Sequence, residues 1–356
     1  MSEIVVRIAE SKKDKKAFID FAYRLYKNEK NWVPPFRMEV SEFLNPKKHP
    51  FYEHGTITPY IAIRDNKVVG RIAAIINGNH NAHHKDKTGF FGFFEAVEDI
   101  DVFKALIEPV KEELSEKGMD QILGPVNPSL NDTCLFLTKG FHLPPFVMMS
   151  YNFPYYAELF YEMGFNKAKG FYAYYGSAKV STVNEKMLQV ERILKKRNYK
   201  IREIKMKDWK KEANTIADIF ADAWSKNWGF VPMSEHEFAH TAMNLKMIAV
   251  PKFIYMVEKE GKPVAFSLGL PDINEVLVHN RNGRLRPDII FKLLRRKTNP
   301  RNVRIMLLGV RQEYQKFGIG GVLYAKYMRM ALETGLEGGE MSWVLDDNVE
   351  MNRAQN

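Results

Sequence analysis

A glycine-rich stretch near the end of the chain has the residue types and spacing of an anion-binding loop. Residues 303–310 form an apolar run that predicts a buried strand, and residues 322–332 show the apolar spacing of a helix. Between them lies Gln315-Lys316-Phe317-Gly318-Ile319-Gly320-Gly321. A strand, a glycine loop and a helix in this order direct several backbone N–H groups toward one anion. The glycines let the main chain approach a phosphate closely, and Lys316 adds a positive charge.

This loop differs from two common phosphate-binding loops. It lacks the Gly-Lys-Ser/Thr of a P-loop, and residues 318–321 lack the third glycine of the dinucleotide fingerprint. It resembles the acyl-CoA loop of the GNAT N-acetyltransferase superfamily, Gln/Arg-x-x-Gly-x-Gly/Ala, which reads here Gln315-x-x-Gly318-x-Gly320. The resemblance implies that the loop amides hold the CoA pyrophosphate and that the end of the preceding strand pairs with the pantetheine arm.

The resemblance assigns a set of cofactor-binding residues by position. The strand end corresponds to Gly309, Val310 and Arg311. The loop itself corresponds to Gln315, Lys316, Phe317, Gly318, Ile319, Gly320 and Gly321. The alternative is a tight strand-to-helix turn in which the glycines serve packing only.

The two halves of the chain echo each other. Residues 60–74 and residues 255–269 both read as a strand, a turn and a strand, and each is preceded by a helical stretch. A further apolar strand and a helix follow each hairpin, and each half then has an apolar strand followed by an Asn, at 146–149 and at 343–345. This order resembles a mixed α/β acetyltransferase domain. We therefore expect an α/β protein with mixed sheets, built from two tandem GNAT-like domains at residues 1–178 and 179–356.

The first half departs from the family at the cofactor loop. It has no loop glycines there, and Glu95, Glu98, Asp99 and Asp101 place negative charge near a helix N-terminus. Acidic residues stabilise such a helix end but repel a pyrophosphate. We expect the first domain to have a degenerate cofactor loop, and the second domain to bind acyl-CoA.

The second domain has few residues after its last predicted strand. A strand at 168–175 is expected to close the first domain, whereas the second domain lacks its last helix and closing strand. An open edge would expose unpaired backbone. Three explanations are a truncated gene product, which we favour, a strand supplied by another molecule, or coverage of the edge by the first domain.

The resemblance implies transfer of an acetyl or other acyl group from CoA to an amine. The backbone N–H of Val310 is the expected donor to the thioester oxygen, by analogy with the family, and Asn348 either touches the cofactor or caps the next helix. No general base is evident. Asp346 and Asp347 favour a turn, Glu313 favours solvent, and no Tyr follows Asn348 in the segment where the family often has its general acid.

Two histidine patterns suggest metal sites, but neither is complete. His80, His83 and His84 read as a solvated loop. His236 and His240 form a His-Glu-x-x-His pattern, typical of zinc proteases, but no third ligand follows at a suitable position. A polar helix face is the simpler interpretation, although the pair could line the acceptor side of the cleft. We expect no metal site.

Composition indicates a globular protein without a membrane span. The chain of 356 residues has 45% hydrophobic residues, a net charge of +10 and a single cysteine, Cys134. No apolar run approaches the roughly 20 residues of a transmembrane helix, and the N-terminus reads as a strand rather than a leader. We expect a cytoplasmic protein with an amine acceptor of small-molecule or peptide type, no membrane partner and a possible homodimer.

The sequence leaves three functions open. The first is an acyl-CoA-dependent N-acyltransferase that uses the C-terminal domain. The second is a catalytically inactive, CoA-binding or regulatory module. The third, a nucleic-acid-associated protein, is supported by the basic charge alone and has no dense basic and aromatic strip behind it.

Overall fold

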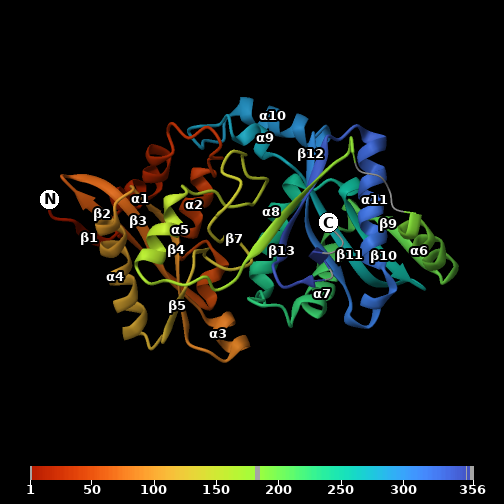
Figure 1. Ribbon diagram of the computed structural model, residues 1–356, viewed down its shortest axis with the longest axis horizontal. Helices are drawn as coiled ribbons and strands as arrows, with labels where there is room; N and C mark the ends of the chain where they lie inside the picture. The colour runs from red at the N-terminus through yellow and green to blue at the C-terminus, as the bar shows by residue number, and fades with distance from the viewer. Residues whose placement is uncertain (1, 181–184, 350, 353–356) are drawn as a thin grey trace. The chain divides into compact units, whose positions relative to one another are not determined.

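The structure, a computed structural model, describes residues 2–180, 185–349 and 351–352 (Figure 1). Contacts within the chain divide it into two compact units. The N-terminal unit comprises Met1–Ala168, Gly229–Glu237 and Asn274–Ile290. The C-terminal unit comprises Lys169–Trp228, Phe238–Ile273 and Phe291–Asn356. Each unit is built around one mixed β-sheet, which confirms the expected fold class.

The sheet of the N-terminal unit has five strands in the order β1-β2-β3-β4-β5. These strands are β1 (Val5–Ile8), β2 (Gly55–Arg64), β3 (Lys67–Asn77), β4 (Thr88–Ala96) and β5 (Gln121–Leu123). The β4–β5 pair is parallel and the other neighbours are antiparallel. The predicted hairpin is β2–β3, and its turn residues Asp65 and Asn66 have φ of 49° and 59°. Positive φ at both central residues matches the twist of a tight hairpin.

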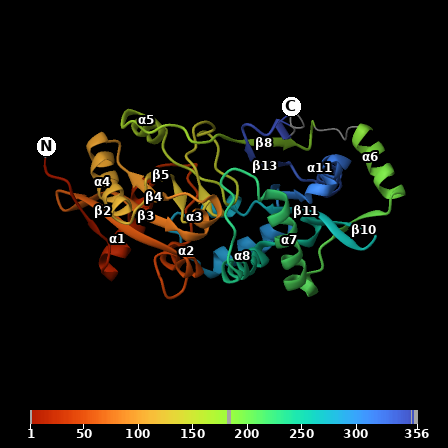
Figure 2. The ribbon, with the colours of Figure 1, turned by 90° about the horizontal axis from the view of Figure 1, so that it is seen from below.

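Helices cover both faces of this sheet (Figure 2). The helices of this unit are α1 (Lys12–Leu25), α2 (Arg37–Phe43), α3 (Gly78–His84), α4 (Ile100–Glu116), α5 (Tyr155–Glu162) and α9 (Asn274–Leu277). The unit also contains the short turn η1 (Pro50–Glu53) and the small strands β6 (Val126–Asn127) and β7 (Thr133–Cys134). On one face α4 and α5 bury an aromatic core that includes Phe94, Phe103 and Phe160. On the other face α1 packs through Phe18, whose carbonyl accepts a hydrogen bond from the buried Arg71 at 3.0 Å.

The sheet of the C-terminal unit has six strands in the order β8-β13-β12-β11-β10-β9. They are β8 (Phe171–Ser177), β9 (Tyr199–Glu203), β10 (Ile254–Lys259), β11 (Lys262–Pro271), β12 (Asn302–Val310) and β13 (Gly338–Leu345). The second predicted hairpin is β10–β11, again with positive φ at both turn residues, Glu260 (52°) and Gly261 (81°). The repeat of the hairpins is therefore confirmed.

The helices of the C-terminal unit are α6 (Glu185–Lys196), α7 (Trp209–Trp224) and α11 (Ile319–Thr334), with η2 (Met206–Asp208), η3 (Pro251–Phe253) and η4 (Gln312–Phe317). Leu194 of α6 and Val322 of α11 belong to one buried cluster with strand residues such as Val264. Trp224 of α7 packs against Phe266 of β11, at 6.1 Å between ring centroids. Two further helices, α8 (Glu235–Ile248) and α10 (Pro287–Thr298), begin in the N-terminal unit and end in the C-terminal unit.

Strand β8 corrects the expectation for the closing strand. The segment was expected to close the first sheet, but it pairs antiparallel with β13, from Gly338 opposite Ser177 to Leu345 opposite Phe171. The expected gap beside β13 is therefore filled by β8, the last strand of the expected first domain. The predicted strand at 146–149 is also wrong, because this segment forms a turn. Pro144 and Pro145 just before it cannot donate to a strand ladder.

Candidate functional site

The predicted anion loop lies between β12 and α11 in the C-terminal unit. Gly318 adopts φ of 73°, a left-handed conformation that glycine takes at little cost, and it is the N-cap of α11. Within the described part of the chain, no side chain caps this helix end. The N–H groups of the first turn, at Ile319, Gly320 and Gly321, and the helix dipole therefore face the position an anion would take.

The space around the glycines argues against a role in packing alone. A Cβ at Gly320 would lie 3.5 Å from Leu308, and one at Gly321 would lie 3.9 Å from Met187, which are ordinary contacts. Packing therefore does not require a glycine at either position. Gly309 is different, since its Cβ would meet the rings of Phe266 and Trp224 at 2.6 Å. Gly309 is thus needed for the fit of α7 on the sheet, whatever else it does.

Strands β12 and β13 part next to this loop. Their parallel pairing runs from Asn302–Gly338 to Ile305–Met341 and then stops, while β12 continues along β11 to Val310. The N–H of Arg311 donates to the carbonyl of Val264 at 2.9 Å. Because N–H directions alternate along an antiparallel strand, the N–H of Val310 points to the side from which β13 has departed. The Val310 N–H is therefore a backbone donor in the opening beside β12.

Several predicted side chains are engaged with the protein itself. The Arg311 guanidinium donates to the carbonyl of Pro263 at 3.2 Å, and the Gln315 amide donates to the carbonyl of Val310 at 3.3 Å. Lys316 and Phe317 are exposed. Tyr314 packs beside Tyr199, at 6.3 Å between ring centroids. The loop therefore offers mainly backbone N–H groups and one exposed ammonium group.

The carboxylates at the end of β13 are not arranged as a general base. Lys169 forms ion pairs with Asp346, at 3.9 Å, and with Asp347. The Asn348 side chain accepts a hydrogen bond from the Met351 N–H at 3.1 Å, which is the capping role that the sequence left open. Glu313 is exposed.

A buried polar chain that the sequence did not predict lies where β12 and β13 part. Arg304, only 2% exposed, donates through Nε to the hydroxyl of Ser342 at 2.9 Å, and that hydroxyl donates to Glu340 at 2.6 Å. Burial raises the pKa of Glu340, although Ser342 and Arg304 oppose the shift. The signal available in the sequence was an arginine inside an otherwise apolar strand.

At the equivalent position of the N-terminal unit, the end of β4, tyrosine side chains bind the backbone groups. Val97 N–H donates to Val69, so Ala96 holds the register position that Val310 holds in the C-terminal unit. The Ala96 N–H donates to the Tyr156 hydroxyl at 3.1 Å, and the Ala96 carbonyl accepts from Tyr155 at 2.8 Å. The Glu95 carboxylate accepts from the Tyr156 hydroxyl at 2.7 Å, and burial raises its pKa. These contacts leave no open backbone edge of the kind seen at Val310.

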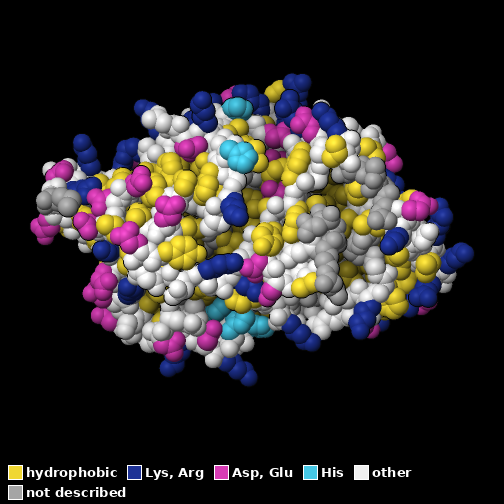
Figure 3. All heavy atoms as spheres, viewed as in Figure 1, with side chains coloured by type: hydrophobic (Ala, Val, Ile, Leu, Met, Phe, Trp, Pro, Cys, Tyr) yellow, Lys and Arg dark blue, Asp and Glu magenta, His cyan; other side chains and the backbone are white. Residues whose placement is uncertain are grey.

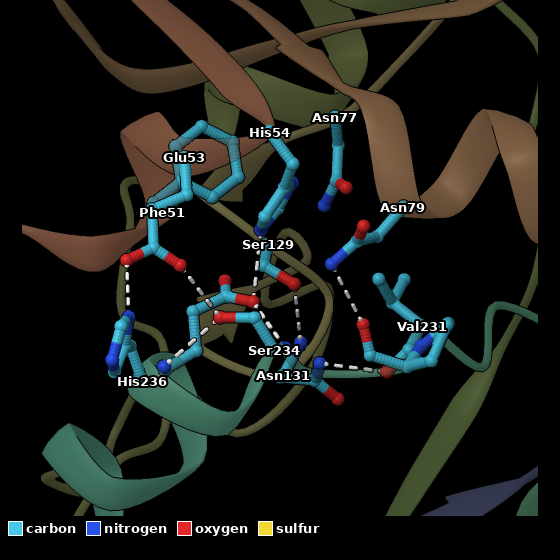
Figure 4. A network of polar contacts seen from close by, with 12 residues as sticks. Phe51, Glu53, His54, Asn77, Asn79, Ser129, Asn131, Val231, Ser234 and His236 are labelled. Carbon is cyan, nitrogen blue, oxygen red and sulfur yellow. Dashed lines mark hydrogen bonds and ion pairs between the residues drawn. The ribbon is translucent and has the colours of Figure 1, made fainter.

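The N-terminal unit also contains a polar network around the start of α8 (Figure 4). Glu53 lies 2.6 Å from Nδ1 of His236, and His54 lies 2.8 Å from Glu237. The N–H of Ser234 donates to the Glu237 carboxylate at 2.9 Å and the Glu237 N–H donates back to Ser234, which forms a capping box. His236 and Glu237 of the His-Glu-x-x-His pattern thus attach the segment Gly229–Glu237 to the rest of this unit.

Further polar contacts hold the same segment. Asn79 and Asn131 donate to the carbonyls of Pro232 and Val231 at 3.1 and 3.0 Å. Beside Glu237, burial and the charges of Glu237 and Glu39 raise the pKa of Asp132 to about 8. No local sequence pattern predicts this network, because its members come from segments 100 or more residues apart.

The histidines at 80–84 lie on helix α3, so the loop expected there is wrong. Asn77 caps this helix by accepting from the His80 N–H at 3.1 Å. His80 is buried, and Nε2 of His84 lies 2.9 Å from the carbonyl of Phe230. Among the described residues, no group of three His, Cys, Asp or Glu side chains is placed to hold a metal ion.

Comparison with known proteins gives relatives over nearly the whole chain. Protein YghO of Escherichia coli (strain K12) is 35% identical over 355 residues, which cover 98% of this chain and 90% of YghO. The bacterial ceramide synthase of Caulobacter vibrioides (strain NA1000 / CB15N) is 31% identical over 343 residues, covering 94% of this chain and 89% of that protein. No family model matches the chain.

Solved structures with the same fold are GNAT proteins. A tandem GNAT protein from the clavulanic acid biosynthesis pathway has a TM-score of 0.52 at 11% identity, covering 100% of this chain and 94% of that one. The GCN5-related glucosamine N-acetyltransferase region of a fungal multi-domain GH3 β-N-acetylglucosaminidase has a TM-score of 0.58 at 13% identity, and the match covers 99% of this chain and 37% of that one. These likenesses establish the fold. The chain therefore belongs to the family of Protein YghO and the bacterial ceramide synthase, and its fold is that of the tandem GNAT N-acetyltransferases.

Proposed function

We propose that the protein is an acyl-CoA-dependent N-acyltransferase whose donor site lies in the C-terminal unit. One observation carries the proposal: β12 and β13 part after Ile305 and Met341, beside a helix N-terminus that no described side chain caps. A diphosphate fits the first turn of α11, and an extended amide-bearing arm fits the backbone edge of β12. CoA has both features.

The acceptor that we propose is the amine of a long-chain amino alcohol. One relative is named a bacterial ceramide synthase, and a ceramide is the amide of a fatty acid with such an amine. By this proposal the donor is a fatty acyl-CoA, and acetyl-CoA is the simplest donor that shares its nucleotide. The tandem GNAT fold supports the reaction type, and the relative supports the choice of acceptor.

The proposed reaction is direct transfer. The neutral amine nitrogen attacks the thioester carbonyl, the C–N bond forms, the C–S bond breaks and CoA leaves as the thiol. The amine loses one proton to solvent or to a carboxylate. The Val310 N–H stabilises the negative charge that develops on the thioester oxygen. The enzyme contributes mainly by holding the two reactants together, an effect that can supply several kcal/mol of the barrier.

Two measurements test the proposal. Calorimetric titration with acetyl-CoA and with palmitoyl-CoA should show binding to the purified chain. A thiol-release assay with palmitoyl-CoA should respond to a long-chain amino alcohol more strongly than to a panel of short and peptide amines. Binding without thiol release for any amine would favour a CoA-binding module without catalysis, and absence of binding would refute both functions.

A further inference from the structure

Helix α10 exposes apolar and basic side chains together. Phe291 is 68% exposed and Leu294 is 58% exposed, and they lie three residues apart on adjacent turns. Four of the twelve residues of this helix are basic, namely Lys292, Arg295, Arg296 and Lys297, whereas Asp288 in the first turn is acidic. Basic and apolar side chains lie side by side at the edge of the molecule where α10 runs, at the top of Figure 3.

The C-terminal end of α8 extends this surface. Met243 and Met247 are 69% and 67% exposed and lie four residues apart, so they share one face of α8. The Lys297 ammonium group donates to the carbonyl of Met247 at 2.9 Å and joins the ends of the two helices. Lys246 adds a further positive charge on α8. We call Met243, Met247, Phe291 and Leu294, with the basic residues of α10 and Lys246, the α8–α10 surface.

We propose that the α8–α10 surface docks the protein onto an anionic lipid bilayer. A helix with apolar side chains on one face and Lys and Arg beside them lies in a membrane interface, where apolar contact and attraction to anionic lipid add together. A cluster of exposed apolar side chains on a monomer generally marks an interaction site. The positive charge favours an anionic partner, because five basic residues lie on the same two helices as the four apolar ones.

This attachment is peripheral. None of the described helices combines the length and the apolar character that a membrane span requires. The proposal differs from the expected absence of a membrane partner, which rested only on the lack of an apolar run of spanning length. It stands on the surface itself and not on the acyl transfer. A lipid-soluble amine acceptor would, however, be reached from such a surface.

Vesicle flotation with the full chain tests the proposal. We expect co-flotation with vesicles of phosphatidylcholine and phosphatidylglycerol at a ratio of about three to one, weaker binding to pure phosphatidylcholine, and weakening at high salt. The double variant Phe291→Ser/Leu294→Ser should bind the anionic vesicles about tenfold less than the native chain. The variant Lys292→Gln/Arg295→Gln should also bind less, by a smaller factor.

Leu332→Ser is the matched control, since Leu332 is 56% exposed and lies on α11, which is not part of the α8–α10 surface. This variant should float like the native chain. Equal flotation of the native chain and the Phe291/Leu294 variant, or binding that ignores lipid charge, would overturn the proposal. So would conversion of a lipid-free dimer to a monomer by the same variant, because the surface would then join two copies. Titration of every variant with acetyl-CoA measures the donor site separately, so a loss of vesicle binding can be told apart from a loss of CoA binding.

Discussion

Ala96 and Val310 show how the partners of one backbone position differ between the two units. Ala96 and Val310 occupy equivalent places at the ends of β4 and β12. The N–H of Ala96 is taken by Tyr156, and Glu95 fills the space beside it with a buried carboxylate. At Val310 the preceding residue is Gly309 and β13 has turned away. The same backbone therefore has a protein partner in one unit and faces an opening in the other.

Gly320 allows a test of the anion site that does not depend on loss of folding. Gly320→Asp places a carboxylate in the first turn of α11, where the helix dipole favours it, so the midpoint of thermal unfolding should stay equal or rise. The same charge should repel the CoA diphosphate and compete for its N–H donors, which lowers affinity by about tenfold or more. Calorimetric titration at low and high salt measures the effect.

Gly320→Asn is the matched control because Asn has the shape of Asp without its charge. Its loss of affinity should be smaller and should not depend on salt. If the Asp variant binds CoA as tightly as the native chain, the diphosphate does not lie at this helix end.

Asp132 predicts a pH dependence of stability. Its pKa is raised from 3.8 to about 8 in the folded chain, so the folded state holds a proton that the unfolded state releases. Its contribution to stability is present below pH 4 and is lost as the pH rises toward 8. Between pH 5 and pH 8 the free energy of unfolding of the native chain should fall at least ~1 kcal/mol more than that of Asp132→Asn. Urea unfolding at the two pH values measures this difference.

The exposed Asp120→Asn variant controls for the loss of one negative charge. It should follow the native chain at both pH values. A native chain and an Asp132→Asn variant with parallel pH profiles would show that Asp132 is already ionised at neutral pH.

Residues that are close in sequence were predictable, and residues brought together by folding were not. The residues of the loop from Gln315 to Gly321 are consecutive, so their sequence pattern alone predicts a turn between a strand and a helix. Two pairs in the polar network join segments that are 183 residues apart in the sequence: Glu53 with His236, and His54 with Glu237. No local pattern encodes such a pair. The pattern of His236, Glu237 and His240 even pointed to different chemistry, because its spacing is also that of an ordinary polar helix face.

At the scale of elements, hairpins and helices followed from local signals, whereas the place of β8 did not. The spacing of apolar residues and the turn residues between them predicted the hairpins β2–β3 and β10–β11 and the helix α11. The aromatic residues of β8 predict a strand but do not indicate which sheet it joins. Its pairing with β13 depends on contacts between residues far apart in the sequence. Gly338 at the start of β13 lets the chain at Gly176 approach closely, since a Cβ on Gly338 would meet the Gly176 carbonyl at 2.4 Å.

Gly338→Ala should therefore weaken the β8–β13 pair. We expect a loss of about 1–3 kcal/mol in the free energy of unfolding, because the added methyl group must displace backbone rather than a flexible side chain. Hydrogen exchange should accelerate at the amides of residues 171–177. Gly321→Ala makes the same chemical change where there is room, and it should raise stability by up to ~1 kcal/mol through helix propensity. Equal effects of the two substitutions would mean that β8 does not lie against Gly338.

At the scale of the whole molecule, the two halves of the chain form two units with similar sheets, one of five strands and one of six. The tandem arrangement was predictable because each half repeats a hairpin, a strand and a helix in order. The assignment of three segments to the other unit was not predictable from the sequence. Residues Gly229–Glu237 and Asn274–Ile290 of the second half belong to the N-terminal unit, and β8 of the first half belongs to the C-terminal unit.

Ligand protection should reveal the different roles of the two units. If acyl-CoA binds only at the α11 end of β12, saturating acetyl-CoA should slow hydrogen exchange at residues 302–325 and leave residues 88–116 of the N-terminal unit unchanged. At a concentration about 100 times the dissociation constant, binding adds ~2.7 kcal/mol to the unit that binds, measurable as a shift in its unfolding transition. Adenosine, which lacks the diphosphate, is the control and should protect neither region. Protection of residues 88–116 by acetyl-CoA would instead place a donor site at the corner that Tyr155 and Tyr156 fill, and would require those tyrosines to move.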